Sequence, residues 1–224
     1  MKGLSAMAGA SLVLLVSVIA WAQPGELLVE DWSKYPVGAK GIPAGWRGQT
    51  WGSPAYDMTI GDESPTKVLH LKSRGDSSTI SKEVKVNVKD FPILEWSWKA
   101  VVLPKGGDAR NKATDDEAIQ LYVTFPRFPS AVRSRIIGYI WDSTAPEGTV
   151  VKSQKTGLVT YVVVQSGEKN LGKWIKESRN VYEDFKKIYG EEPGELEGIS
   201  IAIDSDDTRS TAEAYVGTIR FRKP

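Results

Sequence analysis

The chain has 224 residues, and 29 lysine and arginine side chains face 28 aspartate and glutamate side chains, which gives a formal net charge of +1. This balance excludes the basic excess with which proteins attract nucleic acid or an anionic membrane surface. Cysteine is absent, which excludes disulfide bonds and cysteine-ligated metal sites.

Residues 1–22 have the pattern of a secretory signal peptide. Lys2 precedes an apolar run at 12–19, and Ala20 and Ala22 are the small residues that a signal peptidase selects. An uncleaved membrane anchor is the alternative, but the apolar run is short for a bilayer span. We therefore predict cleavage before Gln23 and an exported protein, periplasmic or secreted, without a membrane span. Loss of Lys2 leaves 28 basic and 28 acidic side chains in residues 23–224.

The first half of the mature chain predicts short strands separated by turns. Strands are expected at 27–32, 67–72 and 84–88, and a loop rich in glycine and proline fills 35–46. The clearest strand is 91–102, where Leu94, Trp96, Trp98 and Ala100 recur at every second position. This period predicts that both tryptophans point into the core. A charged loop follows, and 117–125 is the next strand.

The second half adds strands at 135–141, 158–164, 199–203 and 212–221. The run 158–164 is nearly continuous in apolar residues, which is typical of a central strand buried on both faces. One helix is predicted over 181–189, where Val181, Phe185 and Ile188 share a face. Ser178 or Asn180 can cap its start, and Gly190 ends it.

About nine strands and a single helix predict an all-β protein. The expected fold is an antiparallel two-sheet sandwich of the jelly-roll type, like that of carbohydrate-binding modules, with one α-helix in the C-terminal half. No repeat or linker divides the sequence, so residues 23–224 are expected to form a single domain.

Several phrases occur together in an order that resembles a bacterial exported family designated domain of unknown function 3047. They are Glu95-Trp96-Ser97-Trp98-Lys99, Asp115-Asp116, Leu121-Tyr122-Val123-Thr124-Phe125, Gly138-Tyr139-Ile140-Trp141, the stretch from Ser178 to Phe185, and Asp204-Ser205-Asp206-Asp207-Thr208. The resemblance covers most of the mature chain. It implies export and a sandwich fold, and it carries no assigned activity.

Two acidic segments are candidates for a cation or a hydroxyl-rich ligand. Asp115-Asp116-Glu117 opens a strand, and the alternative for it is a solvated strand entry that protects a sheet edge. Asp204, Asp206 and Asp207 end another strand and are the weak candidates for Ca²⁺, a hard cation that prefers oxygen ligands. An Asx-rich turn is the alternative there. No other cofactor is indicated.

Arg179 precedes the predicted helix. An arginine fork at a helix entry is suited to carboxylate or phosphate ligands. The alternative is a salt bridge to Asp184 or Asp204 that fixes the helix to the sheet. Tyr139 and Trp141 would stack on sugar rings if they lie on an exposed sheet face, and they belong to the core otherwise. The sequence leaves both questions open.

The leading hypothesis is a non-enzymatic protein that binds a glycan or another small polar ligand. The predicted binding residues are Asp116, Tyr139, Trp141, Arg179 and Asp206. One alternative is a carbohydrate-active hydrolase or lyase on the same fold, and another is a structural envelope protein. His70 is the only histidine, which weighs against a serine–histidine–aspartate triad or a histidine-rich zinc site, and we expect it to be structural.

Overall fold

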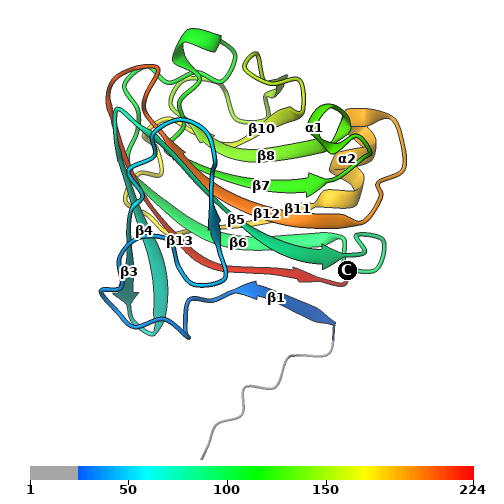
Figure 1. The fold of residues 1–224 in the computed structure, drawn as a ribbon, viewed down its shortest axis with the longest axis horizontal. Helices are drawn as coiled ribbons and strands as arrows, with labels where there is room; N and C mark the ends of the chain where they lie inside the picture. The colour runs from blue at the N-terminus through cyan, green and yellow to red at the C-terminus, as the bar shows by residue number, and fades with distance from the viewer. Residues whose placement is uncertain (1–24) are drawn as a thin grey trace, which may run out of the picture.

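Two β-sheets stacked face to face form the body of the molecule (Figure 1). The computed structural model describes residues 25–224, so the predicted signal peptide lies outside the described residues. Within this range, no helix is long and apolar enough to cross a membrane. The arrangement confirms the predicted β-sandwich of the jelly-roll type.

Sheet A has six strands. Five follow the order β11-β6-β13-β4-β3, and β1 pairs with the C-terminal half of β13. Every pair in this sheet is antiparallel. The strands are β1 (Glu26–Glu30), β3 (Asp57–Glu63), β4 (Thr66–Arg74), β6 (Ile93–Val102), β11 (Ile175–Asn180) and β13 (Thr211–Arg222).

Sheet B has seven strands in the order β2-β5-β12-β7-β8-β10-β9. Its pairs are antiparallel except for β8 and β10, which run parallel. The strand predicted at 158–164 is therefore penultimate in its sheet, not central. The strands are β2 (Arg47–Gly48), β5 (Ser77–Val86), β7 (Ile119–Phe125), β8 (Arg135–Asp142), β9 (Val150–Lys152), β10 (Val159–Ser166) and β12 (Leu196–Asp204).

The predicted helix is α2 (Val181–Tyr189). The Asn180 side chain accepts a hydrogen bond from the Glu183 N–H, and Gly190 ends the helix in the left-handed conformation. Val181 and Phe185 are fully buried, as the periodicity predicts. A second helix was not predicted: α1 (Ser130–Arg133) is a single turn that begins after Pro129, and a 3-10 turn spans Lys112–Thr114.

The core lies between the sheets, and a row of aromatic rings crosses it. Trp96 is 2 % exposed and Trp98 is fully buried, which confirms the predicted orientation of β6. Their rings are perpendicular, with centroids 5.3 Å apart, and Tyr139 and Trp141 meet them from the opposite sheet. A smaller apolar cluster covers part of the outer face of sheet B, and it includes Ile140, Tyr161 and Val163. The valines of β10 are therefore buried on both faces of the strand.

Candidate functional site

A pocket of about 740 Å³ lies on the outer face of sheet B. We call it the sheet B groove. Alternation along the strands forms its floor: Ile80, Leu121 and Ile201 point into the core, so their neighbours face outward. The outward side chains are small or polar, and those of the floor are Thr79, Ser81, Gln120, Tyr122, Tyr161 and Ser200.

Two loops form the walls of the groove. One contains Trp51, whose side chain is 63 % exposed although tryptophan is usually buried. The other contains Lys155 and Thr156. An exposed indole beside a polar floor gives the groove one apolar wall and many hydrogen-bonding groups.

Gly138 allows two tyrosine rings to lie against the floor. A Cβ atom at this position would lie 2.7 Å from Tyr122 Cε1 and 3.1 Å from Tyr161 Cδ1, so a larger residue would displace the rings. The Tyr122 hydroxyl donates to Gln120 Oε1, and Gln120 Nε2 donates to Glu117 Oε2 at 2.5 Å. These bonds link the groove floor to the acidic residues at its end.

Six carboxylates and one lysine gather where β7 begins and β12 ends. We call this group the acidic cluster, and its members are Asp115, Asp116, Glu117, Asp204, Asp206, Asp207 and Lys155. The backbone brings the segments together, because Asp204 N–H donates to the Glu117 carbonyl at 3.2 Å. Asp116 is fully buried and accepts the N–H groups of Asp207 (3.2 Å) and Thr208 (2.7 Å), which fixes the loop after β12. Lys155 pairs with Asp207 and lies 4.0 Å from Asp206.

Burial makes three carboxyl groups of the acidic cluster weaker acids than usual. Burial and the adjacent Asp206 carboxylate raise the pKa of Asp204 to about 9. Burial raises the pKa of Asp115 to about 6, and burial and the Asp115 charge hold the pKa of Glu117 well above its ordinary range. Both carboxylate oxygens of Asp115 and Oε1 of Glu117 are buried without a hydrogen-bond partner among the described residues. Asp115, Glu117 and Asp204 therefore retain protons at pH values where exposed carboxyl groups are ionised.

A cation has three carboxylate oxygens available in the acidic cluster. Asp116, Asp204 and Asp206 each offer one oxygen, and these oxygens lie within 4.8 Å of one another. The sequence predicted Asp207 in place of Asp116, but Asp207 forms an ion pair with Lys155. Ca²⁺ takes six to eight oxygen ligands, and Lys155 already supplies positive charge beside Asp206. Calcium binding stays a prediction.

Tyr139 and Trp141 lie in the core, which decides between the two interpretations that the sequence allowed. Both side chains are fully buried, so neither has a free face for a sugar ring. The Tyr139 hydroxyl donates to Asp184 Oδ2 at 2.9 Å, and Trp141 Nε1 donates to the Gly167 carbonyl at 3.2 Å. Both rings point inward, where they pack on Trp96 and Trp98 of sheet A, and Ile140 between them faces the outer apolar cluster.

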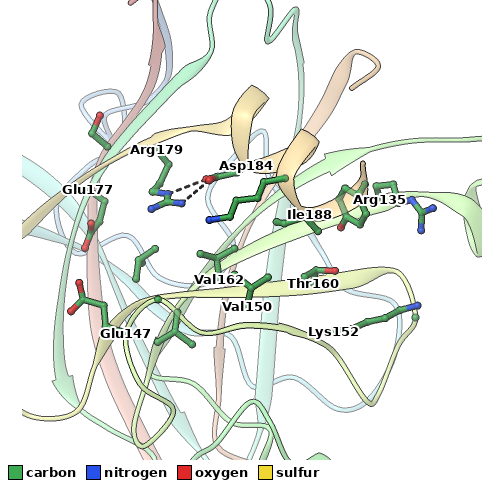
Figure 2. A pocket seen from close by; sticks show the side chains of 17 residues that line it. Arg135, Glu147, Val150, Lys152, Thr160, Val162, Glu177, Arg179, Asp184 and Ile188 are labelled. Carbon is green, nitrogen blue, oxygen red and sulfur yellow. Dashed lines mark hydrogen bonds and ion pairs between the residues drawn. The ribbon is translucent and has the colours of Figure 1, made fainter. Parts of the chain in front are cut away.

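Arg179 forms the predicted ion pair with Asp184. Its Nε donates to Asp184 Oδ2 at 2.9 Å, and its Nη2 donates to Oδ1 at 2.6 Å. The pair lines a second pocket, described below, which Figure 2 shows. The structure thus places Asp206 in the sheet B groove with Asp116 behind it, and Arg179 elsewhere, so the five predicted residues do not share one site. A role in ligand binding stays a prediction for Asp116, Asp206 and Arg179.

Most residues of the sheet B groove were not predicted from the sequence. The hydroxyl and amide side chains on β5, β7 and β12 alternate with core residues, and this alternation was a usable signal. Trp51 gave only a weak signal, because it lies in a glycine-rich loop with no period. His70 stacks on Tyr215 with centroids 4.1 Å apart, and its Nε2 lies 2.7 Å from Glu213 Oε1, so it is part of the framework as predicted.

Comparison with solved structures shows distant sandwich proteins. A family 11 carbohydrate-binding module from Clostridium thermocellum, in complex with a β-1,3-1,4-mixed-linked tetrasaccharide, is 8% identical with a TM-score of 0.46, and the match covers 89% of this chain and 96% of that one. A cellulase derived from Cel12A of Rhodothermus marinus is 11% identical with a TM-score of 0.43, and the match covers 87% and 96%. At this similarity, neither the ligand nor the activity of these proteins extends to this chain.

Sequence comparison identifies the family. No curated protein matches the chain. A family described as "Protein of unknown function (DUF3047)" matches residues 44–220, and this range contains every strand of both sheets except β1 and the end of β13. The match includes both acidic segments and the floor of the sheet B groove. The chain therefore belongs to the DUF3047 family.

Proposed function

We propose that this protein binds a carbohydrate in the sheet B groove. The observation that carries the proposal is the exposed Trp51 indole beside a floor of hydroxyl, amide and carboxylate groups. A sugar ring has apolar C–H faces and polar hydroxyl edges, so it needs both kinds of surface. The volume of about 740 Å³ lies within the usual range of ligand pockets.

The chemistry of the groove favours a neutral, hydroxyl-rich ligand over a charged polymer. Asp206 can accept hydrogen bonds from ligand hydroxyl groups, and the Asp204 carboxyl group, whose pKa is raised to about 9, can also donate one. Ser81 and Ser200 donate to each other or to a ligand, since their hydroxyl oxygens lie 2.8 Å apart. Lys155 is paired with Asp207 and does not offer a free positive charge to an anionic chain.

Export belongs to the same proposal. Residues 1–22 carry the signal-peptide pattern, and a glycan ligand would be met outside the cytoplasm. N-terminal sequencing of the protein purified from the source cell should give Gln23 as the first residue. A mature protein that retains residues 1–22 would contradict this part of the proposal.

Binding to a panel of soluble glycans tests the proposal. Affinity electrophoresis should show that at least one neutral glycan retards the folded protein. Trp51→Ala should weaken that binding by at least about tenfold, which corresponds to about 1.4 kcal/mol of lost stacking. Phe128→Ala is the matched control, because Phe128 is 90 % exposed and lies outside the groove. Absence of binding to every glycan, with a folded sample, would refute the proposal.

One observation favours hydrolysis as a second candidate function. Asp204 has a pKa of about 9 and lies beside Asp206 in the groove, so one carboxyl group holds a proton next to another that is a candidate base. Glycoside hydrolysis uses a protonated acid and a carboxylate in this way. Release of reducing ends from a bound glycan, abolished in Asp204→Asn, would support hydrolysis. Binding without any release would leave the protein a binding module.

A further inference from the structure

A second pocket, of about 960 Å³, lies where the two sheets end side by side. We call it the edge pocket. β11 is the last strand of sheet A and pairs only with β6, while β9 is the last strand of sheet B and pairs only with β10. Each strand therefore has one edge without a partner strand, and both strands line the pocket together with α2 (Figure 2). Unpaired strand edges are the surfaces to which extended peptides add.

Two glutamates lie on one side of the edge pocket. Figure 2 shows Glu177 of β11 and Glu147 of the turn before β9 on this side. Glu177 Oε1 accepts hydrogen bonds from Gln165 Nε2 at 2.8 Å and from Trp98 Nε1 at 3.3 Å, so this carboxylate is fixed by neutral donors. Within residues 25–224, no basic group lies within 4.0 Å of either carboxylate. Neither carboxylate therefore has an ion-pair partner among the described residues.

Two lysines also line the pocket. Lys152 ends β9 and appears on the side opposite the glutamates in Figure 2, and Lys187 belongs to α2. Neither lysine forms an ion pair in the part of the chain that the structure describes, whereas the adjacent Lys186 pairs with Glu192 at 3.0 Å. Arg179 and Asp184 neutralise each other. Lys152 therefore lies opposite the two glutamates, and Lys187 is a second lysine of the pocket without an ion-pair partner among the described residues.

The floor between the charged sides is apolar. Val150, Val162 and Ile188 point into the pocket, and Val162 also belongs to the main core. A complementary ligand has an ammonium group, a carboxylate group and a short apolar body, with backbone groups free to pair with a strand edge. A short peptide with free ends has all four features.

We propose that the edge pocket binds a peptide of about two to four residues in an extended conformation. The amino end lies at Glu147 and Glu177, and the carboxyl end lies toward Lys152 and Lys187. This site is separate from the sheet B groove, because the two pockets share no lining residue. The proposal goes beyond carbohydrate binding and does not depend on it.

Calorimetry with the tripeptide Ala-Val-Ala tests the proposal. The free tripeptide should bind, and its N-acetylated and C-amidated forms should bind at least about tenfold more weakly, because each lacks one of the end charges. Glu147→Gln should weaken binding of the free tripeptide and remove the difference from the acetylated form. Glu147 is exposed, so this variant should fold normally. Lys187→Gln should act in the same way on the amidated form.

Two controls make the result specific. Lys186→Gln removes a lysine on the same helix that already has a partner, and it should leave peptide affinity unchanged. Trp51→Ala should also leave it unchanged, so that a failure of carbohydrate binding and a failure of peptide binding can be told apart. If the folded protein does not bind the tripeptide at about 10 mM, or binds all three forms equally, the proposal is wrong.

Discussion

Arg179 illustrates how one side chain at the edge of a pocket can serve the fold. Its guanidinium forms a two-point contact with Asp184, and Asp184 also accepts the hydroxyl of the buried Tyr139. The Asp184 side chain is only 14% exposed, so loss of this partner would leave its charge poorly compensated. The three residues connect β11, β8 and α2 in one polar group.

We predict that Arg179→Lys lowers stability by about 1–2 kcal/mol, because lysine keeps the charge and loses the planar fork. Urea denaturation of the variant and the wild type measures the difference. Lys176→Arg, an exposed exchange on the same strand, is the control and should change stability by less than about 0.5 kcal/mol. Unchanged stability in Arg179→Lys would show that the ion pair does not support the fold.

Asp204 should make stability depend on pH. Burial and Asp206 raise its pKa from 3.8 to about 9. Between these values the folded protein keeps a proton that the unfolded chain has released, so stability should fall as the pH rises from about 4 to 9. One such proton limits the slope to about 1.4 kcal/mol per pH unit. Asp204→Asn should flatten the fall in urea midpoints between pH 5 and 8. Asp62→Asn, which changes an exposed carboxyl group, is the control and should keep the wild-type slope. An equal slope in Asp204→Asn and Asp62→Asn would contradict the prediction.

Calcium should act against that loss of stability if Asp116, Asp204 and Asp206 bind it. Ionisation at high pH frees carboxylate oxygens, and a divalent cation would compensate their mutual repulsion. We therefore expect about 10 mM Ca²⁺ to raise the melting temperature more at pH 8 than at pH 5, through preferential binding to the folded state. Asp204→Asn should lose most of the effect. Equal melting curves with and without calcium at pH 8 would rule out the site.

At the scale of elements, α2 shows which force holds a short helix in place. A helix of nine residues is marginal by itself, so tertiary packing must stabilise it. We predict that Phe185→Ala costs about 3–5 kcal/mol, because Phe185 is fully buried against Phe125 with ring centroids 4.6 Å apart. Asn180→Ala, which removes the cap, should cost about 1 kcal/mol. Denaturant unfolding measures the stability of both variants. A larger loss of stability in Asn180→Ala than in Phe185→Ala would contradict this prediction.

The sequence revealed β6 most clearly, because its two faces differ. Half-buried and buried residues alternate over residues 93–100, and this period was visible. β3 was missed although Met58 and Ile60 are buried and their neighbours are not, so a short alternation was not recognised. β11 was missed because its inward residues are Glu177 and Arg179, charged side chains that line the edge pocket. β2 and β9 are too short to carry a period.

The predicted site was incomplete for a similar reason. In β8, both faces are covered from Ile137 onward, so consecutive residues are buried and the period cannot show which way Tyr139 and Trp141 point. The order of the strands in the sheet decides which acidic segments lie side by side. Asp116 and Asp206 are 90 positions apart in the chain, and only the pairing of β7 with β12 brings their segments together. Pairing of distant strands is not encoded in local spacing.

At the scale of the molecule, core packing joins the two sheets, and a few polar contacts such as Lys82 with Glu30 add to it. Cysteine is absent, so no disulfide contributes. The main core includes side chains from both sheets and from α2, and successive strands such as β4 and β5 lie in opposite sheets. Neither sheet can keep its inner face buried without the other. This favours the predicted single domain.

We therefore predict one cooperative unfolding transition. Far-UV circular dichroism, which reports on both sheets, and tryptophan fluorescence should give the same urea midpoint. Trp98→Ala should lower both midpoints together and cost about 3–5 kcal/mol, a large share of the roughly 5–15 kcal/mol that stabilises a domain. Trp51→Ala is the matched control, since its exposed indole should contribute less than about 0.5 kcal/mol. Two separate transitions would mean that the sheets unfold independently, and a small loss in Trp98→Ala would mean that the central indole does not join them.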